Sequence, residues 1–144
     1  MENAAMTSEL LRAYSKDPIG KWTMENSSVS MKQKNTVCWD ELTVFLNIWK
    51  KIDISWKEVF FIEDRSRDWY TEMQTTAAAS MLAETIIWVD IKTVLTRDYI
   101  YIKELWLELS PRRRRSWVTA LLATRNAIHF YLGDGISESF EELL

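Results

Sequence analysis

The stretch Val37–Ile52, VCWDELTVFLNIWKKI, carries the clearest hydrophobic pattern in the chain. Five apolar residues recur in it at intervals of 4, 3, 4 and 3 positions: Cys38, Leu42, Phe45, Trp49 and Ile52. At about 100° per residue they occupy a narrow arc of an α-helix. The pattern therefore predicts a helix over residues 37–52 with this face buried, and it makes Cys38 a small core residue rather than a catalytic thiol.

The distribution of glycine and proline also favours helices over strands. Neither residue occurs in the 90 positions from Lys21 to Ser110, whereas stacked β-hairpins usually need them at their turns. We therefore predict an all-α fold, a compact single-domain bundle of about six helices that spans residues 1–144.

Local start and stop signals divide this bundle into elements. A capping box at Ser55–Glu58 begins one helix, and a long helix over 68–95, apolar on most sides in its second half, is the candidate for the central helix. Residues 96–110 are read as a helix despite a strand-like composition. The last long helix begins at Ser110–Pro111 and ends at Gly133. Residues 21–35 are predicted to form an irregular or mobile loop, with a small hairpin as the alternative.

Composition and charge restrict the class of protein. The formal net charge is −3, so the whole chain is not a polycation. A single cysteine excludes an internal disulfide and fits a reducing compartment. Neither a secretory signal nor a transmembrane span is expected, and we predict a soluble, intracellular protein of the cytoplasm or nucleus. The eight tryptophans are expected to lie mostly in the core.

Four consecutive arginines, Arg112, Arg113, Arg114 and Arg115, open the last long helix and are its strongest functional signal. Cations are unfavourable at a helix N-terminus, which already carries partial positive charge. The run therefore suggests an anionic partner, for which guanidinium groups and free N–H groups are suited. The alternatives left open are an external anion and the acids of the protein itself.

An acidic amphipathic segment, residues 133–144, follows the last long helix. It contains four carboxylates and no cation. Its apolar residues align on one face of a short helix, as in segments that bind in a groove of a partner: Ile136, Phe140, Leu143 and Leu144. We predict a partner-binding tail here, with packing on its own domain as the alternative, and folding back onto the arginines as a further one.

Catalytic, cofactor and metal motifs are not evident in the sequence. His129 is the sole histidine and is read as a surface or hydrogen-bonded residue. We therefore expect no enzyme, no cofactor and no metal site. The predicted function is a helical protein–protein interaction or regulatory module that binds another protein through an acidic or groove-bearing surface. A homodimer is an alternative arrangement, and nucleic-acid or phosphate binding through Arg112–Arg115 is the alternative function.

Overall fold

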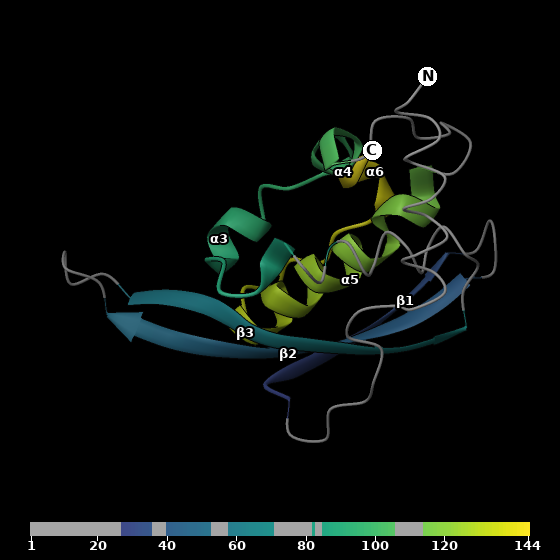
Figure 1. Cartoon of the computed structure of the whole chain (residues 1–144). Coiled ribbons are helices and arrows are strands. Elements are labelled where there is room, and N and C mark those ends of the chain that lie inside the picture. Colours follow the sequence, from purple (N-terminus) through teal and green to yellow (C-terminus); the bar gives the residue numbers. More distant parts are fainter. Residues whose placement is uncertain (1–26, 36–39, 53–57, 71–81, 83–84, 106–113) are drawn as a thin grey trace.

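The computed structural model describes residues 27–35, 40–52, 58–70, 82, 85–105 and 114–144. Strands come first along this part of the chain and helices follow (Figure 1). The strands are β1 (Val29–Asn35), β2 (Asp40–Ile52) and β3 (Glu58–Tyr70). The helices are α3 (Ile91–Val94), α4 (Tyr99–Leu105), α5 (Arg114–Leu132) and α6 (Phe140–Leu143).

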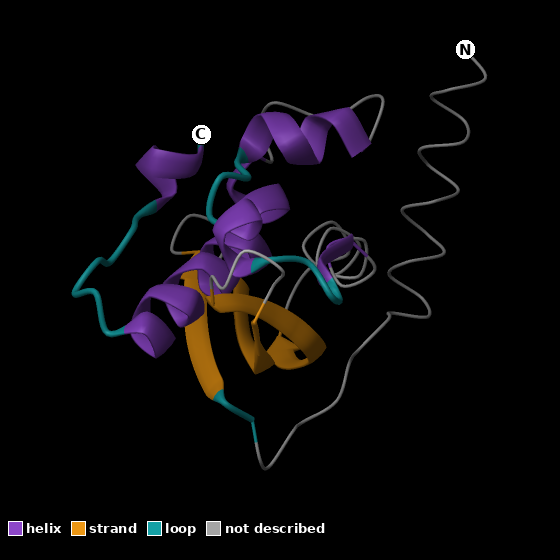
Figure 2. Cartoon of the chain, turned by 90° about the vertical axis from the view of Figure 1, so that its left-hand side faces the viewer, coloured by secondary structure: helices purple, strands orange, loops and turns teal. Residues whose placement is uncertain are grey.

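The strands form an antiparallel sheet in the order β1-β2-β3. Val29 of β1 lies opposite Leu46 of β2, and Leu42 of β2 lies opposite Trp69 of β3. The pairing of β2 with β3 shifts register between Asn47 and Ile48. The described helices gather over one face of this sheet (Figures 1 and 2). The fold is thus α/β in content, and the prediction of an all-α bundle of about six helices is wrong.

The physical reason for the error lies within β2. The residues that are buried alternate along it, with exposed fractions of 0% to 7%: Leu42, Val44, Leu46 and Ile48. Alternation is the signature of a strand with one buried face. The helical reading instead required Phe45 and Trp49 to be buried, yet Phe45 is half-buried and Trp49 is 54% exposed. The same segment contains apolar residues at helical spacing and apolar residues at strand spacing. The burial of the side chains shows that the strand is the structure that forms. Cys38 lies outside the described residues.

The absence of glycine and proline was likewise misleading. The segments between the strands, 36–39 and 53–57, contain neither residue and lie outside the described residues, so β1, β2 and β3 form without a glycine or proline between them. The helix predicted to begin at the capping box Ser55–Glu58 is wrong, because Glu58 is the first residue of β3. Residues 29–35, predicted as irregular, form β1, while 21–26 lie outside the described residues.

Helix α5 is the central helix of the described fold. Every residue from Ser116 to Thr124 is buried. Nine consecutive residues point in all directions around a helix, so other elements surround this part of α5. Two of its buried hydroxyls bond within the helix, since Thr119 donates to the carbonyl of Arg115 at 2.6 Å and Thr124 to that of Ala120 at 2.8 Å.

Predictions for the other helices have mixed outcomes. The last long helix is confirmed from Arg114 to Leu132. A helix within 96–110 is confirmed as α4. The long helix over 68–95 is wrong at both ends, because residues 68–70 belong to β3 and the chain turns at Trp88, whose φ is 60°, before α3 begins. Trp88 is also 50% exposed, whereas Trp117, at 2%, is buried as predicted.

No helix in the described part of the chain is long and apolar enough to span a membrane.

Candidate functional site at the C-terminal end of α5

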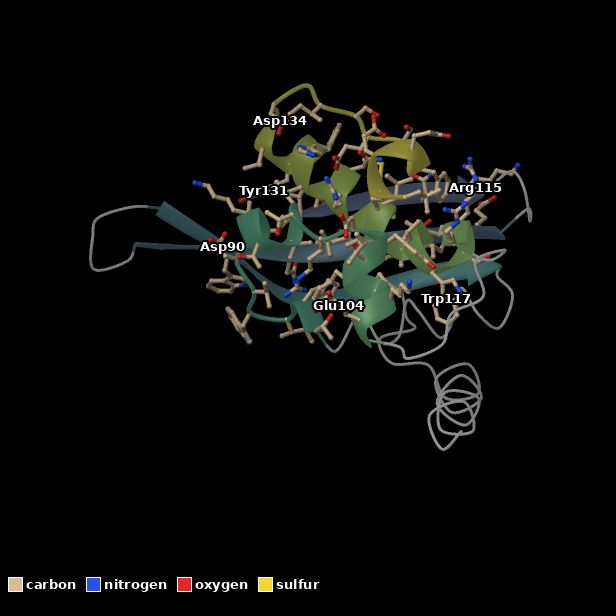
Figure 3. The ribbon with its side chains drawn as sticks, turned by 90° about the horizontal axis from the view of Figure 1, so that it is seen from above. Asp90, Glu104, Arg115, Trp117, Tyr131 and Asp134 are labelled. Atoms are coloured by element: carbon tan, nitrogen blue, oxygen red, sulfur yellow. The ribbon has the colours of Figure 1, made fainter. Side chains whose placement is uncertain are left out.

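The candidate site forms where the chain leaves α5 and turns back onto it. Gly133 and Gly135 have φ values of 65° and 74°, a region that glycine enters without the steric cost that other residues meet. The Gly133 N–H donates to the carbonyl of His129 at 3.0 Å and ends the helix. These two glycines direct residues 134–138 back along the helix, where Asp134 lies beside its last turn (Figure 3).

Arg125 and Glu138 are the main connection between α5 and this returning segment. Nε of Arg125 donates to Oε2 of Glu138 at 2.8 Å, and a second guanidinium nitrogen pairs with Oε1. Nη1 of Arg125 donates to the carbonyl of Arg97, before α4, at 2.6 Å. Both side chains of the ion pair are 11% exposed. Two parallel charge-assisted bonds in a mostly buried position fix the geometry strongly.

Asn126 adds a second pair of bonds to Glu138. Its amide nitrogen donates to the Glu138 carbonyl at 3.0 Å, and its oxygen accepts from the Glu138 N–H at 2.8 Å. The backbone of Glu138 is therefore satisfied in full by one side chain of α5, much as it would be in a sheet. Side chain and backbone of Glu138 are held by adjacent residues of the same helix.

His129 contacts a carboxylate with each ring nitrogen. Nδ1 lies 2.7 Å from Oδ2 of Asp134, Nε2 lies 3.1 Å from Oε2 of Glu138, and the residue is 7% exposed. A neutral imidazole has one N–H, so the protonated form is the one that donates both bonds. The bond from His129, and next the Ile136 N–H at 2.9 Å, hold the pKa of Asp134 below its ordinary value.

A pocket of about 660 Å³ lies between these residues and the sheet. Its walls come from β1, from the last turns of α5 and from the returning segment: Met31, Lys32, Gln33, Asn126, His129, Phe130, Gly133, Gly135, Ile136, Ser137 and Glu138. Phe130 and Ile136 are 73% and 54% exposed. The charged groups in the wall from α5 and Glu138 bind one another, so the groups that remain for a ligand include the exposed apolar side chains of Phe130 and Ile136, with Lys32 at the β1 side.

These groups do not form a metal site. The two carboxylates lie on different nitrogens of the His129 ring and hence on different sides of it. Among the described residues there is no group of three His, Cys, Asp or Glu that could hold a metal ion.

Arg115, the last residue of the arginine run, lies at the other end of α5 (Figure 3). Arg115 and His129 are fourteen residues apart, about 21 Å along a helix. The Arg115 guanidinium pairs with Glu141 at 3.2 Å and lies 5.1 Å from the centre of the Phe140 ring. Arg115 thus meets the protein's own tail, one of the alternatives the sequence left open. Arg114 is exposed, and Arg112 and Arg113 lie outside the described residues.

The residues of the predicted partner-binding tail separate into two groups. Phe140 and Leu143, 8% and 1% exposed, belong to the hydrophobic core. Ile136 and Leu144 are 54% and 40% exposed. In this conformation the first two hold α6 on its own domain, and Ile136 contributes to the pocket. A role of the exposed pair in binding a partner stays a prediction.

Sequence reasoning missed the polar network of Arg125, Asn126, Asp134 and Glu138, although it expected His129 to be a surface or hydrogen-bonded residue. A signal was present. Arg125 and His129 are four residues apart, on one face of a helix, and the glycines that follow allow the chain to reverse. Which acids then meet which cations depends on the exact turn, which the sequence pattern does not define.

Comparisons with known proteins support the corrected fold. No protein-family model matches the sequence, and no curated protein sequence matches it. Several solved structures do resemble the chain, among them two of similar extent. One, from Fervidobacterium islandicum, is described as an iron–sulfur cluster assembly scaffold protein for the SUF system; it has a TM-score of 0.64 and 17% identity over 87% of this chain and 98% of its own. The other is the N-terminal part of a nitrogen-fixing NifU-like protein from Brucella abortus, with a TM-score of 0.63 and 12% identity over 89% and 94%.

This resemblance overturns the predicted helical interaction module and its nucleic-acid-binding alternative, since both were built on a fold that the chain does not have. At these identities the resemblance establishes the fold, and the chain therefore has the fold of the iron–sulfur scaffold and NifU-like structures.

Proposed function

We propose that the protein takes part in iron–sulfur cluster assembly as a non-enzymatic protein of the scaffold fold, binding another protein of that process without holding a cluster on a single chain. The observation that carries the proposal is the extent of the structural match, 98% of the chain of the SUF scaffold structure. A match over a whole domain is more informative than one over a shared motif. The proposal includes an intracellular location, which a single cysteine fits.

The ligand chemistry separates this protein from a cluster carrier. Iron–sulfur clusters of the common types are held by about four cysteine thiolates, and the whole chain contains one cysteine, Cys38. The described residues contribute no substitute group of histidine and carboxylate ligands. The residues present therefore do not fit a cluster held within one chain, so we derive no step through a bound cluster.

A partner-binding role is supported by the apolar surface around the pocket. Phe130 and Ile136 both line the pocket and are both more than half exposed. Apolar side chains exposed at a hollow commonly mark an interaction site.

Deletion of the gene tests the role in assembly. In cells that lack the protein, we expect lower activity of an iron–sulfur-dependent hydratase and unchanged activity of a dehydrogenase that has no cluster. Expression of the chain from a plasmid should restore the hydratase, and so should the Cys38→Ser variant, because the proposal gives Cys38 no cluster to hold. Equal hydratase activity with and without the gene would refute a role in cluster assembly.

A further inference from the structure

Strand β1 lies at one edge of the sheet. In the described part of the chain, β2 is the strand that pairs with it, and no further strand lies on its other side. An edge strand directs alternate N–H and C=O groups away from its neighbour, and these groups can pair with a strand from another chain. Segments of partner proteins often bind to sheets in this way.

The pocket borders this same edge. Three consecutive residues of β1 line it: Met31, Lys32 and Gln33. Successive side chains of a strand point to opposite faces of the sheet, so a cavity lined by all three residues reaches the edge of β1 as well as the face that α5 covers. An extended segment paired with β1 would therefore run along the pocket and direct a side chain into it.

The wall of the pocket opposite β1 determines which kind of side chain the pocket can hold. Phe130 and Ile136 present apolar surface. The nearby charges are already engaged, because Glu138 pairs with Arg125 and His129 contacts both Glu138 and Asp134. A volume of about 660 Å³ accommodates a large aliphatic or aromatic group.

The charge of β1 determines the kind of occupant. Its exposed side chains are Ser30, Lys32 and Lys34, and the Lys32 side chain is 64% exposed even though it pairs with Glu41 at 2.5 Å. If a second copy paired through the same strand, lysines would approach lysines, which is destabilising. A segment with acidic residues is complementary instead.

We propose that β1 and the adjoining pocket bind an extended, acidic segment of a partner protein, which adds to the sheet as a strand and places one large apolar side chain between Phe130 and Ile136. The inference deepens the proposed function, on which it rests for the role of the partner, by naming how the partner is held. The contacts themselves follow from the geometry of β1 and the pocket.

A labelled peptide with Val-Glu-Phe-Glu-Val at its centre tests this directly by fluorescence anisotropy with the full chain, because alternation along a strand directs Phe to the pocket and both glutamates to the opposite face, where Lys32 lies. We expect binding that Ile136→Asp weakens at least about tenfold, because the new carboxylate lies in the apolar wall. Lys32→Gln should weaken binding and flatten its dependence on salt. The matched control is Ile100→Asp on α4, which alters an apolar residue of 62% exposure outside the pocket lining and should leave binding unchanged.

Two further peptides separate strand addition from simple apolar adsorption. Proline in place of each valine removes N–H groups and should abolish binding, and lysine in place of glutamate should weaken it. No binding of the first peptide, or binding that Ile136→Asp leaves unchanged, would overturn the inference, as would a dimer in light scattering that Lys32→Gln strengthens. A failure here leaves the gene-deletion result untouched, so the docking mode and the assembly role fail separately.

Discussion

Nε of Arg125 lies 2.8 Å from Oε2 of Glu138, and this ion pair joins the middle of α5 to the segment that follows it. The same carboxylate oxygen lies 3.1 Å from Nε2 of His129. One acidic side chain therefore contacts both Arg125 and His129 on one helix and forms part of the wall of the pocket.

Replacement of Glu138 should destabilise the fold. In Glu138→Gln the guanidinium of Arg125, whose side chain is 11% exposed, loses its counter-charge. Leaving a mostly buried charge unpaired lowers the free energy of unfolding by about 3 kcal/mol. Urea denaturation measures this change. Glu104→Gln, at an exposed position of α4, is the matched control and should change stability by less than about 0.5 kcal/mol. Similar values for the two variants would contradict the role given to the ion pair.

Stability at acid pH should depend on Asp134. Its pKa is below the ordinary value of 3.8 in the folded protein, chiefly because of the bond from His129. A lowered folded-state pKa gives stability that is present above the unfolded-state value and is lost as pH falls through the folded-state value. Asp134→Asn should therefore reduce the loss of stability below about pH 4. Thermal unfolding of both proteins across this range measures it, and parallel pH profiles would argue against the assignment.

Truncations in β2 distinguish a strand from a helix. Leu46 is fully buried, so Leu46→Ala should lower the free energy of unfolding by about 2–5 kcal/mol. Trp49 is 54% exposed, and Trp49→Ala should lower it by clearly less, despite the larger side chain. Chemical denaturation of the two variants gives the order. The opposite order is what a helix with Trp49 on its buried face predicts.

The turn after α5 depends on the conformation of Gly133. With φ at 65°, Gly133→Ala places a Cβ in a left-handed conformation and should lower stability by about 1 kcal/mol. No heavy atom lies within 4 Å of the added Cβ, so crowding does not contribute. Gly133→Asn should be milder, because asparagine tolerates this region better. If urea denaturation shows equal losses for the two variants, backbone conformation is not the cause.

The sequence predicts the secondary structure correctly where the apolar residues follow one spacing only. The helix that becomes α5 has a proline before it, a glycine after it and buried Trp117 and Leu121 on one face, and its extent is confirmed from Arg114 to Leu132. Along β2 the apolar residues fit both the spacing of a strand and the spacing of a helix, and Phe45 and Trp49 belong to the helical pattern. Burial against α5, a contact between residues far apart in the sequence, favours the alternate set instead.

The candidate site was less predictable than the fold. Each member of the network has an ordinary local context, and its partners lie 5 to 13 positions away or, for the Arg97 carbonyl, 28 positions away. The pocket adds β1, which ends 79 positions before α5 begins. A sequence pattern along one helix indicates which residues share a face, but it does not indicate which strand faces them.

We propose that this protein of the scaffold fold holds no cluster on a single chain, and anaerobic reconstitution is the direct test of that proposal. The purified chain is incubated with ferrous iron and sulfide, desalted, and analysed for iron, sulfide and visible charge-transfer absorption, beside the Cys38→Ser variant. We expect no stable cluster on the monomer of either protein. A cluster that remains bound to the monomer and is lost in Cys38→Ser would contradict it.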